Sequence, residues 1–230
     1  MSEIIEQAEI DLIKTSVTEI INSIPPEVML VAASKTRTAE EVQVAIDTGI
    51  KTVGYNYVQE AEKIFQIIGN QVQWHLIGHL QKNKVKKAVK IFDMIETIDS
   101  VELAEKVDKE CKLNNKIMPV LIEINSGEES NKTGVFPEDV EKLIFQIKDL
   151  PNIRIKGLMT MGPRFGDPEK SRPYFKITKK AFDSLKVQNI PNVEMKYLSM
   201  GMSNSYSIAI KEGANIVRIG TKLFGERCRT

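Results

Sequence analysis

Short apolar runs alternate with stretches of helical periodicity along most of the chain. Apolar residues recur at helical spacing over residues 4–22, a proline pair ends that pattern, and an apolar run follows at Val28–Ala33. Thr38 and Glu41 then match a capping box at the start of another amphipathic stretch. The chain is therefore predicted to begin with a helix, a strand and a second helix.

The same alternation continues to the end of the chain. Further strands are predicted at Thr52–Gly54, Gln73–Ile77, Phe92–Glu96, Ile117–Ile124, Ile153–Met159, Glu194–Ser199 and Ile216–Arg218. Further helices are predicted over 57–68, 100–113, 137–148 and 168–187. Eight short buried strands alternating with helices favour parallel βα units, and thus a single (β/α)8 TIM barrel domain over residues 1–230, with an extra N-terminal helix.

An open, doubly wound α/β sheet is the alternative fold. Its dinucleotide-binding form needs a G-x-G-x-x-G turn after the first strand, whereas here that strand runs into SKTRTAEE without a glycine. The barrel is therefore favoured. The loop at Gly162–Pro173 is predicted to be an insertion in it.

Composition narrows the range of partners and compartments. The 32 Lys and Arg residues nearly balance the 31 Asp and Glu residues, so we expect no nucleic-acid partner, and we read the lysine-rich segment Gln81–Lys90 as a solvated helix face. Cys111 and Cys228 form no metal-binding motif, so we expect no metal. The N-terminus lacks a basic leader and no long uncharged apolar run occurs, so we expect a soluble, cytoplasmic protein with no membrane contact.

Active sites of TIM barrels lie at the C-terminal ends of the strands, so the polar residues that follow each strand are the candidates for chemistry. Lys35 follows the first strand and Asn56 the second. An amine at the mouth of an apolar barrel is partly desolvated, which lowers its pKa and makes it available to attack a carbonyl. By position alone, a solvated loop lysine is the commoner interpretation.

The loops after the seventh and eighth predicted strands combine glycines with hydroxyl side chains. The segment LSMGMSNS contains Ser203, and RIGTKLFG contains Gly220 and Thr221 before a helical run. Backbone amides at a helix start bind anions, and TIM barrels frequently bind phosphate with these two loops. Together the loops predict a phosphate site, although each hydroxyl taken singly is more typical of a helix cap.

A carbonyl-seeking lysine and a phosphate site on opposite rims of one barrel mouth fit an aldehyde-bearing phosphate cofactor, namely pyridoxal 5'-phosphate (PLP). Arg218 would then point toward the ring of the cofactor. A guanidinium beside the pyridine nitrogen disfavours ring protonation, because both groups would be cations. An unprotonated ring is a weaker electron sink, which limits carbanion chemistry.

Seven motifs in order make this chain closely resemble the pyridoxal-phosphate-binding homeostasis proteins (the YggS/PROSC family), whose barrel is similar to the N-terminal domain of alanine racemase. They are VAASKTR (31–37), VGYNYVQEA (53–61), WHLIGHLQKNK (74–84), INSGEESNKTG (124–134), GLMTMG (157–162), LSMGMS (198–203) and VRIGTKLFGER (217–227). The resemblance implies an alanine-racemase-like barrel with Lys35 bonded to PLP as a Schiff base. It further implies roles for the phosphate-binding Ser203, Gly220 and Thr221, for Arg218 at the pyridine nitrogen, and for Asn56, Ser199 and Met200 near the ring.

The resemblance also implies a role in intracellular PLP (vitamin B6) homeostasis without a well-established catalytic activity. PLP-dependent apoenzymes or free amino acids would be the partners, and we expect a monomer. The alternative is a PLP-dependent amino-acid racemase, but racemases of the related fold add a second β domain, for which the predicted barrel leaves no residues. Tyr55, Asn204 and Ser205 replace acids that are common in the family, which predicts a less negative rim.

Overall fold

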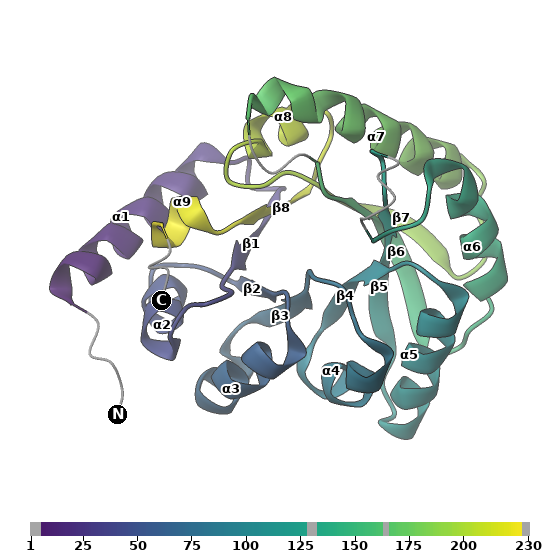
Figure 1. The fold of residues 1–230 in the computed structure, drawn as a ribbon, viewed down its shortest axis with the longest axis horizontal. Helices are drawn as coiled ribbons and strands as arrows, with labels where there is room; N and C mark the ends of the chain where they lie inside the picture. Colours follow the sequence, from purple (N-terminus) through teal and green to yellow (C-terminus); the bar gives the residue numbers. More distant parts are fainter. Residues whose placement is uncertain (1–5, 128–132, 163–165, 227–230) are drawn as a thin grey trace.

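Eight parallel strands close into a barrel in the computed structural model, which describes residues 6–127, 133–162 and 166–226 (Figure 1). The strands are β1 (Met29–Ala33), β2 (Thr52–Tyr55), β3 (Gln73–Leu76), β4 (Met94–Ile98), β5 (Met118–Ile124), β6 (Ile153–Thr160), β7 (Val193–Ser199) and β8 (Ile216–Ile219). Each strand pairs with the next along the chain, and β1 also pairs with β8, with Met29 opposite Ile216. The predicted TIM barrel is confirmed, and the open sheet is excluded by the β1–β8 pair.

Helices surround the barrel on its outside (Figure 1). They are α1 (Gln7–Ser23), α2 (Ala39–Asp47), α3 (Val58–Ile68), α4 (Val85–Ile91), α5 (Val101–Leu113), α6 (Val140–Ile147), α7 (Arg172–Val187), α8 (Tyr206–Lys211) and α9 (Thr221–Phe224). The predicted capping box begins α2, since the Thr38 hydroxyl accepts from the Glu41 amide at 3.2 Å and the Glu41 carboxylate accepts from the Thr38 amide at 2.7 Å. In the predicted insertion at 162–173, residues 163–165 lie outside the described residues, and a short 3-10 turn occupies Pro168–Ser171.

Two apolar layers stabilise this arrangement. Between the strands and the helices lies a continuous buried layer that includes Trp74, whose ring stacks on Tyr55 at 5.5 Å. A smaller cluster fills the barrel itself, formed by Val31, Ile77, Met94, Leu121, Met159 and Ile216. Side chains of one strand alternate between the two layers, which fixes the register of every strand.

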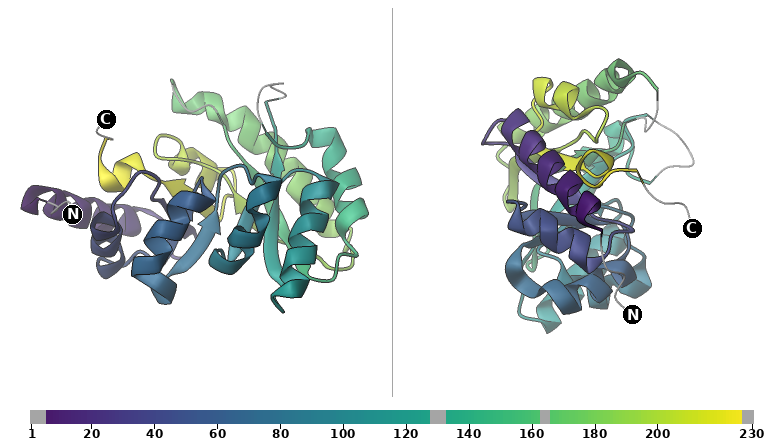
Figure 2. Two further views of the ribbon diagram at one scale, coloured as in Figure 1. Left: turned by 60° about the horizontal axis from the view of Figure 1, so that its bottom comes forward. Right: turned by 90° about the vertical axis from the view of Figure 1, so that its left-hand side faces the viewer.

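The N-terminal helix α1 packs against α2 and α9 at the side of the barrel where the chain closes the ring (Figure 2). Arg37, just before α2, supports the same corner: its Nη2 donates to the carbonyl of Gly225 at 2.6 Å, and its guanidinium lies 5.5 Å from the centre of the Phe224 ring. The extra N-terminal helix therefore helps to hold α9, which contains only four residues. Within the described ranges, no helix combines the length and the apolar character that crossing a membrane requires.

Candidate functional site

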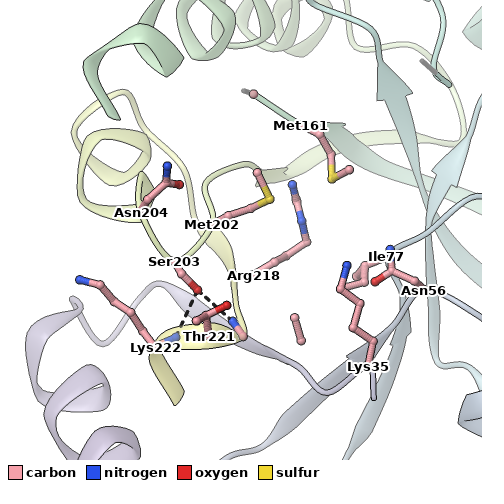
Figure 3. A pocket seen from close by; sticks show the side chains of 13 residues that line it. Lys35, Asn56, Ile77, Met161, Met202, Ser203, Asn204, Arg218, Thr221 and Lys222 are labelled. Carbon is pink, nitrogen blue, oxygen red and sulfur yellow. Dashed lines mark hydrogen bonds between the residues drawn. The ribbon is translucent and has the colours of Figure 1, made fainter. Parts of the chain in front are cut away.

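A cavity of about 540 Å³ opens at the C-terminal ends of the strands. Its size falls in the range of small-molecule sites. Strand β8 and the segments that follow β1, β2, β7 and β8 bring into it six of the residues that the sequence singled out. These are Lys35, Asn56, Ser203, Arg218, Gly220 and Thr221. Ile77, Met161 and Met202 contribute an apolar wall, and Figure 3 shows Lys35 on one side of the cavity and Ser203 with Thr221 on the other.

A tight turn after β1 presents Lys35 to the cavity. The Arg37 amide donates to the Ser34 carbonyl at 3.2 Å across this turn, and the Ser34 amide donates to Gly54 in β2 at 3.0 Å. Thr36 adopts a left-handed backbone with φ of 66°, and its amide donates to the Glu60 carboxylate. A β-branched residue in that conformation is strained and persists only where its surroundings impose it, so the turn fixes the half-buried lysine in place.

Ser203 joins the two loops of the predicted phosphate site. Its Oγ accepts from the backbone amides of Gly220 at 3.2 Å and Lys222 at 3.4 Å (Figure 3). A Cβ at Gly220 would lie 3.0 Å from the Ala33 carbonyl oxygen, so a glycine is needed for β8 to end this close to β1. A hydroxyl that already accepts two hydrogen bonds still has its own O–H to donate. The loops after β7 and β8 are thus one polar unit that faces Lys35.

Arg218 projects from β8 into the bottom of the cavity and is itself 3% exposed. Its Nη1 donates to the Ser199 hydroxyl, and its Nη2 donates to the Thr160 carbonyl at 2.8 Å. The Glu96 carboxylate, which is fully buried, lies 3.8 Å from Nη1 and accepts from Ser199 Oγ at 2.6 Å. Its other oxygen lies 2.7 Å from His75 Nδ1.

The pKa values of Glu96 and Arg218 are shifted by burial and by the groups that contact them. Burial acts to raise the pKa of Glu96, but the hydrogen bond and charge interaction with His75, the positive charge of Arg218 and the hydrogen bond from Ser199 together lower it below its usual range. Burial lowers the pKa of Arg218, and the charges of Glu96 and Glu123 oppose that shift. Because an arginine stays protonated in proteins, the floor of the cavity holds an ion pair.

Two residues that the resemblance implied near the ring do not line the cavity. Ser199 lies beneath its floor, between Glu96 and Arg218, and Met200 is buried in the layer between strands and helices. Tyr55 is also fully buried in that layer, so it does not lie on the rim, and the Ser205 hydroxyl is buried and accepts from the Met202 amide. Tyr55 and Ser205 therefore do not lie on the rim, whereas Asn204 lines the cavity.

The contact between His75 and Glu96 was not predicted from the sequence. Glu96 was expected at the end of its strand but lies inside β4, and His75 lies inside β3. The available signal was an ionisable residue directly beside apolar residues on each strand, His75 between Trp74 and Leu76 and Glu96 after Ile95. Within the described ranges, no three His, Cys, Asp or Glu side chains are grouped so that they could hold a metal ion.

The chain is similar to known proteins over nearly its whole length. The family model of the alanine racemase N-terminal domain matches residues 9–228. A pyridoxal phosphate homeostasis protein of Aquifex aeolicus is 43% identical over 86% of this chain and 86% of its own length, and one of Schizosaccharomyces pombe is 37% identical over 95% and 91%.

Solved structures agree with these relatives. The structure of PipY of Synechococcus elongatus with PLP bound has a TM-score of 0.85 at 31% identity, covering 93% of this chain and all of that chain. An alanine racemase of Clostridium difficile has a TM-score of 0.75 at 16% identity, covering 95% of this chain and 60% of that chain, so it supports the fold alone.

Proposed function

The chain belongs to the family of the alanine racemase N-terminal domain and to the pyridoxal phosphate homeostasis proteins, and we propose that it binds PLP in the cavity at the barrel mouth as part of intracellular PLP homeostasis. One observation carries the proposal for this site: Lys35 lies across a single cavity from Ser203, Gly220 and Thr221, with Arg218 at its floor. These groups match an aldehyde, a phosphate and a ring nitrogen.

The position of each lining residue indicates which part of PLP it would contact. PLP supplies an aldehyde that bonds reversibly to amines. The turn after β1 would direct the Lys35 amine toward that aldehyde. Ser203 would donate its O–H to the phosphate, Gly220 would let the backbone approach it, and Thr221 would offer its amide and hydroxyl at the start of α9. Arg218 would present a fixed cation to the ring nitrogen and so disfavour a proton there.

The residues that line the cavity favour binding and release over racemisation. A two-base racemase needs a proton-transfer group on each side of the substrate carbon. The described lining contains no Tyr, His, Cys, Asp or Glu side chain. Its other lysine, Lys222, places its Nζ 5.2 Å from the centre of the Tyr206 ring and points away from Lys35 in Figure 3.

The test is to load the purified protein with PLP, record its visible absorption spectrum, reduce it with borohydride and map the modified peptide. We expect a yellow protein with the label on Lys35. Lys35→Ala should lose both the band and the label, whereas the matched variant of the second lining lysine, Lys222→Ala, should retain them. A label that scatters over surface lysines, or that survives Lys35→Ala, would refute the site.

Delivery of the cofactor is the finer part of the proposal. The open cavity supports exchange of PLP with apoenzymes or free amino acids, and a site built by one chain supports action as a monomer. We place this action in the cytoplasm as part of the same proposal. Mixing the loaded protein with a PLP-requiring apoenzyme should restore that enzyme's activity, and light scattering should give the mass of one chain. Fast exchange of the Cα hydrogen of alanine with deuterated solvent, abolished by Lys35→Ala, would instead favour the racemase.

A further inference from the structure

A buried polar chain runs beneath the cavity, and Arg218 is the one member of it to which a role has been assigned above. It passes from His75 on β3 to Glu96 on β4, then to Ser199 on β7 and Arg218 on β8. Thr160 on β6 closes it, because its carbonyl accepts from Arg218 Nη2. Residues of five strands therefore form one hydrogen-bonded chain that includes the Arg218 guanidinium.

We propose that Glu96, held by His75 and Ser199, is the positioning residue that fixes Arg218 toward the bound cofactor. This inference rests on the proposed function. A guanidinium has five N–H donors in a rigid plane, so holding some of them fixes the direction of the rest. Here Nη1 and Nη2 both donate hydrogen bonds below the cavity, to Ser199 and Thr160. These two partners therefore fix the direction of the guanidinium edge that faces the cavity.

Glu96 is placed to control the direction of the Arg218 guanidinium. One carboxylate oxygen accepts from Ser199, and the same hydroxyl accepts from Arg218, so Glu96 determines which way the Ser199 O–H points. The other oxygen is held by His75. An ionised carboxylate can only accept, so Nδ1 of His75 carries the hydrogen in this contact. Neither residue lines the cavity, so each acts on the cofactor only through Arg218.

The experiment is a double-mutant cycle on the dissociation constant of PLP, measured by quenching of the one tryptophan, Trp74. Glu96→Gln keeps the shape of the side chain and removes its charge. In protein that retains Arg218, this change should weaken PLP binding about tenfold. In an Arg218→Gln background the same change should weaken binding less than about twofold. Glu96→Asp, which restores the charge, should recover part of the loss. Equal losses in both backgrounds would overturn the inference.

The barrel offers a matched control in Glu123. It is also a buried carboxyl inside the barrel whose charge acts on Arg218, but its Oε1 accepts from Thr133 and it forms no described hydrogen bond with Ser199, the hydroxyl through which Glu96 reaches Arg218. Glu123→Gln should therefore leave the dissociation constant within about twofold of the native value. A loss equal to that of Glu96→Gln would show that any buried carboxyl near Arg218 has this effect, and the positioning role would fail.

One further variant replaces Glu96→Gln if that protein does not fold, and the native protein separates failure of the proposed function from failure of the positioning role. If Glu96→Gln does not fold, Ser199→Ala removes the bridging hydroxyl without changing a charge, and it should weaken binding at least about threefold; unchanged binding overturns the inference. Native protein that binds no PLP, or binds it without Lys35, refutes the proposed function itself. Native protein that binds through Lys35, with an unaffected Glu96→Gln variant, refutes only the positioning role.

Discussion

Neutralising Glu96 should destabilise the ligand-free protein, because it leaves the Arg218 guanidinium buried without its counter-ion. The two groups lie 3.8 Å apart. At an effective dielectric constant of about 20, unit charges at that distance attract by about 4 kcal/mol. Removing one partner of a buried pair typically costs about 3–5 kcal/mol. Glu96→Gln should therefore lower the free energy of unfolding by about 4 kcal/mol, a large part of the stability of an ordinary domain.

Urea unfolding and thermal melting without PLP would measure this effect. A loss of about 4 kcal/mol in a chain of this length lowers Tm by about 8–16 °C. The double variant with Glu96→Gln and Arg218→Met carries no buried charge at this site, so it should recover most of the loss. If the double variant is no more stable than Glu96→Gln, or if Glu96→Gln melts like the native protein, the uncompensated charge is not the cause.

The pH dependence of the same variant gives a second check. The pKa of Glu96 is lower in the folded protein than its ordinary value of 4.5. Its contribution is therefore present above pH 4.5 and is lost as the pH falls through the folded-state value. The stability difference between native protein and Glu96→Gln should be largest near neutral pH and should shrink in acid. A difference that stays constant from pH 7 to pH 3 would contradict the ionised state of Glu96.

Three further changes test other parts of the structure. Burial raises the pKa of Glu123 above its ordinary value of 4.5, so its protonated form stabilises the fold and that contribution is lost as the pH rises; Glu123→Gln should therefore gain stability relative to the native protein as the pH rises above 4.5, measured by urea unfolding. A Cβ at Gly78 would lie 2.5 Å from the Asn56 carbonyl oxygen, so Gly78→Ala should shift Asn56 and weaken PLP binding at least about threefold by fluorescence titration. Lys116 Nζ donates to the Val89 and Phe92 carbonyls at the end of α4, and Lys116→Met should lower the free energy of unfolding by about 1–2 kcal/mol.

Strand order and barrel closure could be predicted because each strand is a short apolar run between helical patterns, and barrels of this class follow from that alternation. The boundaries were less certain. The fourth strand was expected at Phe92–Glu96, but β4 begins at Met94, since the Phe92 amide still donates to Ala88 at the end of α4. A fully buried strand shows no alternation of polar and apolar residues, so an adjoining apolar helix end cannot be separated from it by pattern alone.

The rim of the site was predictable, and its floor was not. Lys35 and Ser203 stand where a chain leaves a strand, which any barrel places at the mouth. The partnership of His75 with Glu96 and of Glu96 with Ser199 depends on which residues face inward and how far the strands are staggered. Those quantities are set by the closure of the whole sheet rather than by any local segment. Sequence reasoning therefore identified Arg218 and Ser199, but not the contacts that join them to Glu96 and His75.

The pairing of β1 with β8 has a consequence for the order of folding. It joins segments from nearly opposite ends of the sequence, with Met29 opposite Ile216 and Ala32 opposite Ile219. Such contacts carry the largest loop-closure cost and form late. Lys35 follows β1 while Gly220 follows β8, so the two sides of the cavity meet only when this seam has formed. If PLP binds there, we expect recovery of PLP binding during refolding to report the closure of the ring, and excess PLP to draw the chain toward the closed ring.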